Sequence, residues 1–425
     1  MFYIDGLKHL NLMGLFTNFR SRMSAIAPGL FIVGYIIGTG SVTSMVLAGA
    51  RYGMSLTWAL LMSCFFTFIM IVAISKITIV TQKTIIFNIR QRFGAFAAIF
   101  IIAGLLVTIT SSISGVTGVV VEVLDEATKL MFPASGGLST LISSAVILSL
   151  LVYLFWTGMH KLFLRFVTAM VGVMGISFVL ANFLIVQDPG AILAGLIPGI
   201  PTVGKPHLII AGIVGTTMAA VVLVSRSMVV AEKKWTVADL RAENKDALIS
   251  MILTFVISGA IMVAAAGTLY KEGIHVENAI EMVRTLEPLA GDFALALFVT
   301  GILAAGLSSI FPNIVLLPWL ICDFMGTERN LKKPLYRAIA VVIGSMGLLI
   351  PVFGGKPVAI MIASQAFSPV MMPLLIIFLI IMLNSKKMMG THTNGPWLNA
   401  GLGTTLLFSL FMFYIALEGY LDVFN

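Results

Sequence analysis

The stretch Gly34-Tyr35-Ile36-Ile37-Gly38-Thr39-Gly40-Ser41 interrupts a hydrophobic segment with three glycines. A second stretch, Gly212-Ile213-Val214-Gly215-Thr216-Thr217-Met218-Ala219-Ala220, interrupts another hydrophobic segment later in the chain. Two broken hydrophobic helices in corresponding positions of two halves are typical of secondary transporters, which bind their substrate between the breaks. Neither stretch contains a carboxylate or an imidazole. The pattern therefore predicts the scaffold of a transporter without the commonest ligands for a metal ion.

The composition indicates a protein embedded in a lipid bilayer. Of the 425 residues, 59% are hydrophobic and only 10% are charged, and the mean hydropathy is +1.07. Soluble domains carry about 25% charged residues, so a soluble globule could not hide this much apolar surface. The predicted fold class is an all-α polytopic membrane protein. Cys64 and Cys322 both lie in apolar segments and are expected to be buried small hydrophobes, without a disulfide or a metal.

Hydrophobic length predicts eleven transmembrane helices. A helix needs roughly 20 apolar residues to cross the hydrocarbon core. On this scale the breaks fall in the first and sixth of the candidate spans, which are approximately 25–49, 55–75, 95–122, 141–158, 163–186, 207–231, 246–270, 291–321, 336–353, 357–383 and 396–420. The polar outer loop between Lys271 and Asp292 is expected to form a short amphipathic helix. The whole of 25–425 is interpreted as a single transmembrane domain.

The placement of Lys and Arg predicts the orientation. With residues 1–24 as a cytoplasmic N-terminal segment, twenty of the 26 Lys and Arg residues fall in inner segments, as the positive-inside rule requires. The C-terminus then lies outside, and the expected location is the plasma membrane, the inner membrane of a bacterium. Topology accounts for the net charge of +8, so nucleic-acid binding is not inferred. Arg226 is expected to extend from the inner end of the sixth span to the interface.

Several motifs make the chain resemble the Nramp family of divalent-metal transporters. They are Gly301-Ile302-Leu303-Ala304-Ala305-Gly306-Leu307-Ser308-Ser309, Ala363-Ser364-Gln365 with Met371-Met372-Pro373-Leu374, and Gln187-Asp188-Pro189-Gly190 with Gly195-Leu196-Ile197-Pro198. The resemblance covers nearly the whole chain. It implies a LeuT-type fold of the APC superfamily, a 5+5 inverted repeat with broken helices one and six. The repeats would be about 25–186 and 207–383, followed by helix eleven at about 396–420.

The chain departs from the family at its metal site. The family's first-span motif is Asp-Pro-Gly-Asn, where this chain has Gly38-Thr39-Gly40-Ser41. The sixth-span motif is Met-Pro-His-Asn, where the register of the glycines places Ala219-Ala220-Val221-Val222. The family's Asp, Asn and Met ligands therefore correspond to Gly38, Ser41 and Ala219, and its sixth-span histidines to Val221 and Arg226. Without these groups, the usual metal site and the usual proton route are predicted to be absent.

The candidate site residues follow from the breaks and from the resemblance. The predicted substrate-binding residues are Gly38, Thr39, Ser41, Thr216, Thr217, Ala219 and Gln365. Related folds hold Na⁺ between the first break and two hydroxyls of the eighth span, which implies a Na⁺ site at Gly34, Ile37, Ser308 and Ser309. No other cofactor is expected. The alternative interpretation is structural, because glycines permit close helix packing and serine hydroxyls commonly bond to a carbonyl in the preceding turn.

Three functions remain open. The first is alternating-access transport of an inorganic cation, divalent and retaining water, because a bare divalent ion needs anionic or soft ligands. The second is Na⁺-coupled or uncoupled transport of a small organic solute such as an amino acid, whose carboxylate helix N-termini could bind. The third is a binding or sensor protein that has lost transport. No nucleophile–base pair lies in the spans, so an enzyme is not expected. The expected assembly is a monomer or a weak homo-oligomer.

Overall fold

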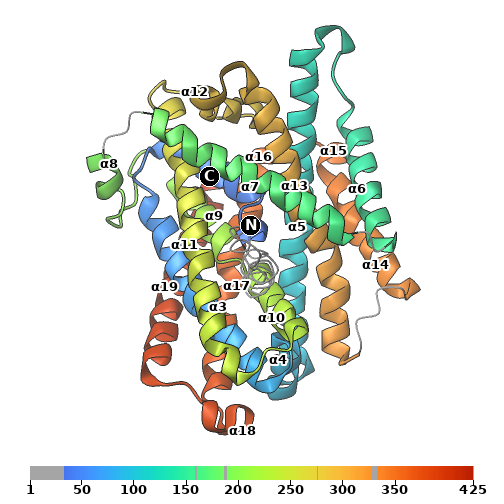
Figure 1. Cartoon of the computed structure of the whole chain (residues 1–425), viewed down its shortest axis with the longest axis vertical. Helices are drawn as coiled ribbons and strands as arrows, with labels where there is room; N and C mark the ends of the chain where they lie inside the picture. The colour runs from blue at the N-terminus through green and yellow to red at the C-terminus, as the bar shows by residue number, and fades with distance from the viewer. Residues whose placement is uncertain (1–32, 158–159, 186–188, 275, 328–332, 425) are drawn as a thin grey trace, which may run out of the picture.

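Hydrophobic segments of the chain form a bundle of long helices (Figure 1). The computed structural model describes residues 33–157, 160–185, 189–274, 276–327 and 333–424, and every regular element in these ranges is helical. The predicted segment 1–24 and Gln187-Asp188 lie outside the described residues. The longer helices are α2 (Thr39–Tyr52), α3 (Thr57–Thr81), α5 (Ala95–Met131), α6 (Thr140–Thr157), α7 (His160–Leu184), α9 (Pro206–Thr217), α10 (Ala220–Lys233), α11 (Leu240–Ala265), α13 (Ala294–Met325), α14 (Pro334–Ser345), α16 (Pro357–Ala366), α17 (Ser368–Leu383) and α19 (Pro396–Phe424).

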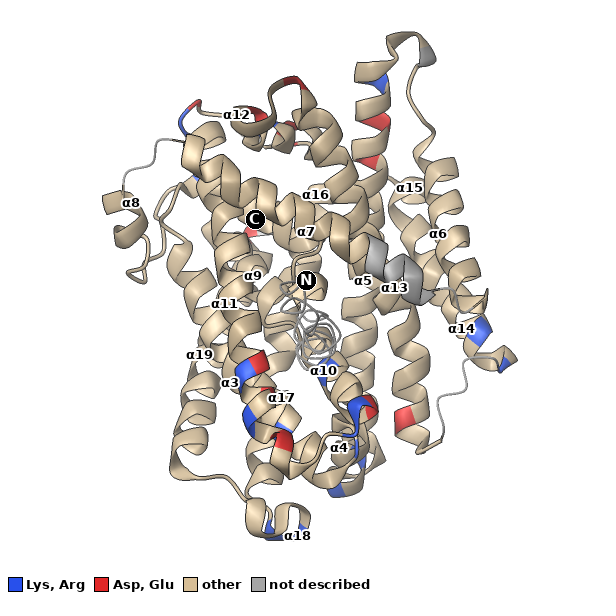
Figure 2. Cartoon of the chain, in the orientation of Figure 1, with Lys and Arg blue, Asp and Glu red and all other residues tan. Residues whose placement is uncertain are grey.

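Ten of the predicted spans are present as helices long and apolar enough to cross a membrane. The first predicted span is described only from residue 33, and its helix α2 has 14 residues. The all-α membrane fold is therefore confirmed, whereas the count of eleven stays a prediction. Figure 2 shows most Asp and Glu near the upper end of the bundle and many Lys and Arg near the lower end, at α3, α4 (Ile85–Phe93) and α18 (Lys386–Met389).

Both predicted breaks interrupt helices. Residues 33–36 are helical, and the backbone leaves the helix at Ile37 and Gly38 before α2 begins at Thr39. In the sixth span, Met218 and Ala219 separate α9 from α10. A third break, which the sequence did not suggest, separates α16 from α17 at Phe367, and Pro369 at the start of α17 lacks the N–H that a continuous helix would use.

Small residues bring the broken helices close to their neighbours. A Cβ on Gly215 would lie 1.9 Å from the carbonyl oxygen of Gln365, so α9 and α16 touch backbone to backbone at this point. A Cβ on Gly49 would likewise lie 2.4 Å from the carbonyl oxygen of Met262 in α11. Small residues at such crossings are common where dispersion and close packing hold membrane helices together. The glycines of the breaks were interpreted either as part of a substrate site or as positions of close helix packing. Gly215 does permit close packing of α9 on α16.

Two of the short helices between the spans differ in how well the sequence predicted them. The expected helix in the outer loop is present as η4, a 3₁₀ helix over Ala279–Thr285, capped by reciprocal bonds between Asn278 and Glu281. Helix α4 was not predicted from the sequence. It buries Ile85, Ile86 and Ile89, and it carries Arg90 and Arg92 in its last turn, where cations favour the negative end of the helix dipole. With nine residues, α4 is too short for its spacing of apolar residues to be recognised among the surrounding charged residues.

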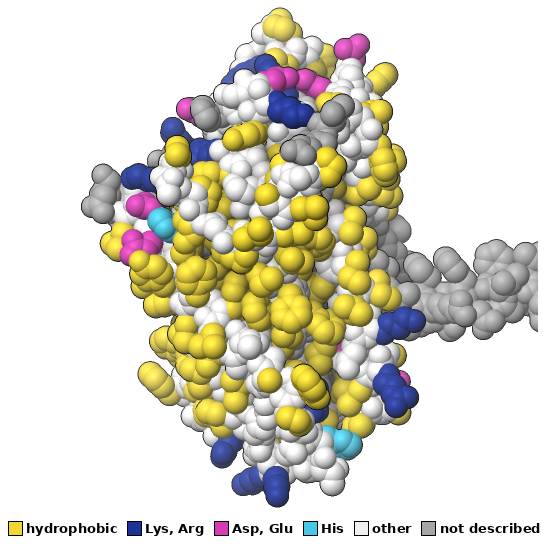
Figure 3. Space-filling model, turned by 90° about the vertical axis from the view of Figure 1, so that its left-hand side faces the viewer, with side chains coloured by type: hydrophobic (Ala, Val, Ile, Leu, Met, Phe, Trp, Pro, Cys, Tyr) yellow, Lys and Arg dark blue, Asp and Glu magenta, His cyan; other side chains and the backbone are white. Residues whose placement is uncertain are grey.

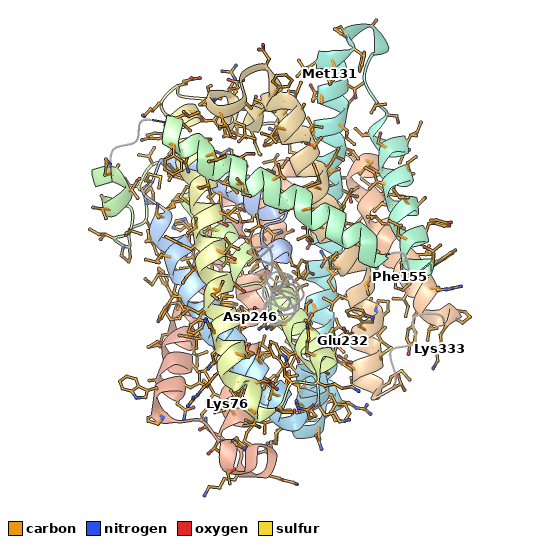
Figure 4. All side chains as sticks on the ribbon, viewed as in Figure 1. Lys76, Met131, Phe155, Glu232, Asp246 and Lys333 are labelled. Carbon is orange, nitrogen blue, oxygen red and sulfur yellow. The ribbon has the colours of Figure 1, made fainter. Side chains whose placement is uncertain are left out.

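Arg226 does not extend to the interface, so the sequence-based interpretation of this residue was wrong. Its side chain is 1% exposed, and one guanidinium nitrogen donates to Glu243 at 3.0 Å and to Asp246 at 2.8 Å. Its Nε also lies 3.4 Å from the hydroxyl of Ser75. Glu243 and Asp246 are on α11, where Figure 4 labels Asp246, so the three charges tie α10 to α11. Two ion pairs are thus buried inside the bundle.

We expect Arg226→Met to lower the free energy of unfolding by about 3–5 kcal/mol, because two buried carboxylates would lose their common partner. Thermal and denaturant unfolding of the purified chain in detergent would measure the loss. The matched control is Arg241→Met, on exposed Arg241 of α11. Adding Glu243→Gln and Asp246→Asn to Arg226→Met should restore at least half of the lost stability. If Arg226→Met and Arg241→Met had the same free energy of unfolding, the buried ion pairs would contribute nothing to stability.

Candidate functional site

A cavity lies at the point where the two breaks meet. The centre of a water molecule can occupy about 50 Å³ of it, and about 10–15 Å³ is enough for one water. The space therefore fits a few waters, or one ion with some of its hydration shell. The lining comes from the two breaks and from α5, α13 and α16: Tyr35, Ile36, Gly38, Gly40, Ser41, Ser112, Val116, Thr216, Ala219, Val221, Val222, Ser309, Asn313 and Gln365.

Most of the residues predicted to bind substrate share this cavity. Five of the seven line it, namely Gly38, Ser41, Thr216, Ala219 and Gln365. The other two have side chains directed elsewhere. The hydroxyl of Thr39 lies 3.4 Å from the carbonyl oxygen of Ile302, and that of Thr217 lies 3.3 Å from the carbonyl oxygen of Ile213. Each threonine hydroxyl thus has a backbone acceptor, and both side chains are fully buried.

The residues of the predicted Na⁺ site are only partly brought together. Ser309 lines the cavity, whereas Ser308, Gly34 and Ile37 do not. Both serine hydroxyls donate to the carbonyl oxygen of Ala305 at 2.9 Å, the bond to the preceding turn that was the alternative interpretation. A Cβ on Gly34 would face Thr168 of α7 at 3.7 Å. The Na⁺ site stays a prediction.

Two glycines of the first break allow side chains of other helices to reach its backbone. A Cβ on Gly38 would lie 2.0 Å from the hydroxyl oxygen of Ser309. A Cβ on Gly40 would lie 2.6 Å from the amide nitrogen of Gln365. Real Cβ atoms do not make such contacts, because the repulsion at these distances is too large. The glycines therefore let one polar side chain of α13 and one of α16 lie directly against the unwound segment.

A chain of hydrogen bonds that sequence reasoning missed joins three more lining residues. The Tyr35 hydroxyl donates to the Asn313 side-chain oxygen at 2.5 Å, and the Asn313 amide donates to the Ser112 hydroxyl at 3.3 Å. These bonds link the first break to α13 and α5. Asn313 and Ser112 are polar residues in apolar spans, a recognised sign of an interhelical or functional contact. That signal could have added them to the candidate residues.

The polar lining of the cavity is uncharged. Among the residues that line it there is no Asp, Glu, His, Lys or Arg, and its polar side chains are hydroxyls and amides. No group of three or more His, Cys, Asp and Glu residues that could hold a metal ion was found in the described part of the chain. Such a site can form hydrogen bonds with a substrate or its waters, but it supplies no formal charge to a substrate.

Comparisons with known proteins agree with the arrangement of helices. A family model described as natural resistance-associated macrophage protein-like, Nramp, matches residues 29–417. The divalent metal cation transporter MntH of Bacillus subtilis is 25% identical over 91% of this chain and 89% of its own length. MntH of Clostridium acetobutylicum is 28% identical, over 47% of this chain and 46% of its own length. The match to the family model extends over both breaks and most of the helices.

Solved structures share the fold. The manganese transporter of Eremococcus coleocola, in complex with an aromatic bis-isothiourea compound, superposes with a TM-score of 0.73 at 17% identity, over 98% of this chain and 88% of that one. Mhp1, a nucleobase-cation-symport-1 transporter, superposes with a TM-score of 0.59 at 15% identity, over 94% and 90% of the two chains. The broken-helix architecture is thus the LeuT-type arrangement. With a family model matched over nearly its whole length, the chain belongs to the Nramp family of integral membrane transporters, which are not enzymes.

Proposed function

We propose that this chain transports a divalent inorganic cation with part of its water shell, by alternating access around the cavity between the two breaks. Relatives named as divalent metal cation transporters support a cation as the substrate. The uncharged lining supports a hydrated one. Removing all water from a divalent ion costs far more than hydroxyl and amide oxygens return, whereas an ion that keeps its waters needs only hydrogen-bond acceptors around it.

The observation that carries the proposal is the set of neutral oxygens around a small cavity. Ser41, Thr216, Ser309, Asn313 and Gln365 line space for a few waters. The hydroxyls of Thr216 and Ser309 donate to the carbonyl oxygens of Ile213 and Ala305 at 2.9 Å, so the lone pairs of their oxygens remain to accept hydrogen bonds. Mg²⁺ is the divalent ion that gives up its waters most reluctantly, and it commonly keeps several of them when bound. Mg²⁺ therefore fits this lining better than Mn²⁺ or Fe²⁺, whose usual sites in proteins supply carboxylate, imidazole or sulfur ligands.

The outer end of the molecule supports entry of a cation. Acidic residues gather at the upper end of α5 and in the neighbouring loop, among them Asp125, Glu126, Glu277, Glu281 and Glu287 (Figure 2). Lys129 pairs with the first two of these, at 2.8 Å and 2.9 Å. The excess of negative charge raises the local concentration of cations and increases their rate of arrival. In the proposed mechanism the driving force is the gradient of the cation itself, without protonation of a residue in the cavity.

A carboxylate-bearing solute is the second candidate. Helices α2 and α10 begin at the cavity without a side-chain cap, so their first N–H groups are available to an anion. Arg51, Lys205 and Lys356 line a second cavity of about 290 Å³ between the ends of α2, α9 and α16, together with the carboxylates of Glu277 and Asp422. Amino-acid-dependent thermal stabilisation that requires Na⁺, with no flux of Mg²⁺, Mn²⁺ or Ca²⁺, would support this candidate and exclude the first.

Reconstituted vesicles provide the direct test. We expect saturable Mg²⁺ uptake down its gradient, unchanged when the pH gradient and the Na⁺ gradient are removed. Thr216→Val, which takes a hydroxyl from the cavity, should reduce uptake by about tenfold, the loss expected for one bond to a charged, hydrated ligand. Thr300→Val is the matched control, since Thr300 is exposed and its hydroxyl bonds within its own helix. Absence of Mg²⁺, Mn²⁺ and Ca²⁺ flux under every gradient would refute the proposal.

Restoring the family's ligands tests the register. Gly38→Asp with Ser41→Asn and Ala219→Met should raise the affinity for Mn²⁺ by about tenfold or more, because a carboxylate and a thioether would then face the cavity. The structure adds one requirement: Ser309→Ala must accompany them, because the Ser309 hydroxyl occupies the position of the new Cβ. Calorimetry measures the affinity, with Ser309→Ala alone as the control. Unchanged Mn²⁺ binding in the quadruple variant would contradict the alignment of positions 38, 41 and 219.

A further inference from the structure

A long apolar groove lies on the surface of the bundle, outside the substrate cavity. It has a volume of about 720 Å³ and runs between α3, α11 and α19. Phe65, Phe68, Ile69 and Val72 of α3 form one wall, and Leu398 and Gly401 of α19 contribute to the other. Figure 3 shows the side of the molecule on which α19 lies, where apolar side chains cover the middle and Lys and Arg stand at the lower end. The groove therefore opens toward the hydrocarbon of the membrane.

One positive charge stands at the end of this groove. Lys76 belongs to its lining, and Figure 4 places Lys76 toward the lower end of the molecule. Its Nζ donates to the carbonyl oxygen of Thr393 at 3.2 Å and to the side-chain oxygen of Asn394 at 3.1 Å. Both acceptors are neutral. No carboxylate of the described residues forms an ion pair with Lys76, so its charge is fixed in position but not neutralised.

The acceptors of Lys76 are themselves held in place. The Asn394 side-chain nitrogen donates to Asn399 at 3.1 Å, and its backbone N–H donates to the carbonyl oxygen of Leu383 at 3.2 Å. Asn399 in turn exchanges bonds with Asn384 at 2.8 Å and 2.9 Å. The network connects α3, α17 and α19 at the lower end of the bundle. Hydrogen bonds to acceptors that are themselves hydrogen-bonded therefore hold the Lys76 ammonium in one position.

The dimensions of the groove match one leaflet of a bilayer. Phe65 and Lys76 are eleven residues apart on α3, which corresponds to about 16 Å along a helix. Half of the hydrocarbon core of a bilayer is about 15 Å thick. Trp397, which is 90% exposed, lies at the same end as Lys76, and tryptophan concentrates at the level of the lipid headgroups. One end of the groove therefore lies at the interface and the other near the centre of the membrane.

We propose that this groove binds one anionic phospholipid, with an acyl chain along α3 and α19 and the phosphate beside Lys76. The apolar walls would contact the acyl chain, and the Lys76 ammonium would pair with the negatively charged phosphate. A juxtamembrane cation attracts anionic lipid by about 1 kcal/mol, which corresponds to a preference of about fivefold over a zwitterionic lipid. The lipid would lie against α3 and α19, which both pack on the broken helix α9. Its binding does not depend on which solute the transporter carries.

Native mass spectrometry of the full chain tests this assignment. The purified protein would be offered equal amounts of phosphatidylglycerol and phosphatidylcholine, and we expect one phosphatidylglycerol to be retained at about fivefold excess. Lys76→Gln keeps a hydrogen-bond donor but removes the charge, so this preference should disappear. The control is Lys386→Gln, which removes an exposed cation from the same end of the molecule but not from the groove, and the preference should persist.

A second variant, Thr404→Phe, tests the groove independently in case Lys76→Gln does not fold. Thr404→Phe would place a ring in the groove while leaving Lys76 and its network unchanged, and it should reduce retention of both lipids. Thermal unfolding with and without phosphatidylglycerol should show stabilisation of the wild type and of Lys386→Gln only. Equal retention of the two lipids by the wild type would overturn the proposal. So would an unchanged preference in Lys76→Gln, or a lipid-free dimer that protects this groove.

Discussion

The contact between backbone and side chains at the first break is the constraint on which the centre of the molecule depends. Gly38 and Gly40 have no Cβ, and the space that each Cβ would occupy is taken by Ser309 and Gln365. Gly215 repeats this arrangement at the second break, where the carbonyl of Gln365 occupies the space. Residue 365 therefore touches both breaks, with its amide on one and its carbonyl on the other. Helix α16 holds the two broken helices in register.

This packing gives the two breaks a structural basis that does not depend on a bound metal ion. In a site that holds a metal ion by charge, the ligands bind the ion but do not hold the helices apart or together. Here Gly38, Ser41 and Ala219, which the family resemblance aligns with the metal ligands, line one cavity. Their convergence comes from glycine packing and from hydrogen bonds such as that between Tyr35 and Asn313. The residues that pack the breaks together therefore also line the cavity, as Gly38, Ser309 and Gln365 do.

Several features could be predicted from the sequence because they depend on local patterns. Spans follow from hydrophobic length, and the breaks follow from glycines within apolar segments. Features that depend on distant partners could not be predicted in this way. Arg226 looked like an interfacial residue because Glu243 and Asp246, its partners, lie 17 and 20 residues away in the chain. Thr39 and Thr217 could be placed at the breaks from the sequence, but the acceptors of their hydroxyls, on Ile302 and Ile213, could not be predicted. The break at Phe367 lies beside Ser364, Gln365, Ser368 and Pro369, in a segment without the glycines that marked the other two breaks.

Buried charged residues and the uncharged cavity lining occupy different parts of α10. Formal charge is concentrated in the buried group of Arg226, Glu243 and Asp246, where it joins α10 to α11. The cavity between the breaks, only a few residues earlier on α10, has none among its lining residues. A charge beside the cavity would either bind a cation tightly or repel it, because the interior screens charge poorly. Arg226 follows the lining residue Val222 by four residues, so the charges lie about one turn further along α10 and leave the lining of the cavity itself neutral.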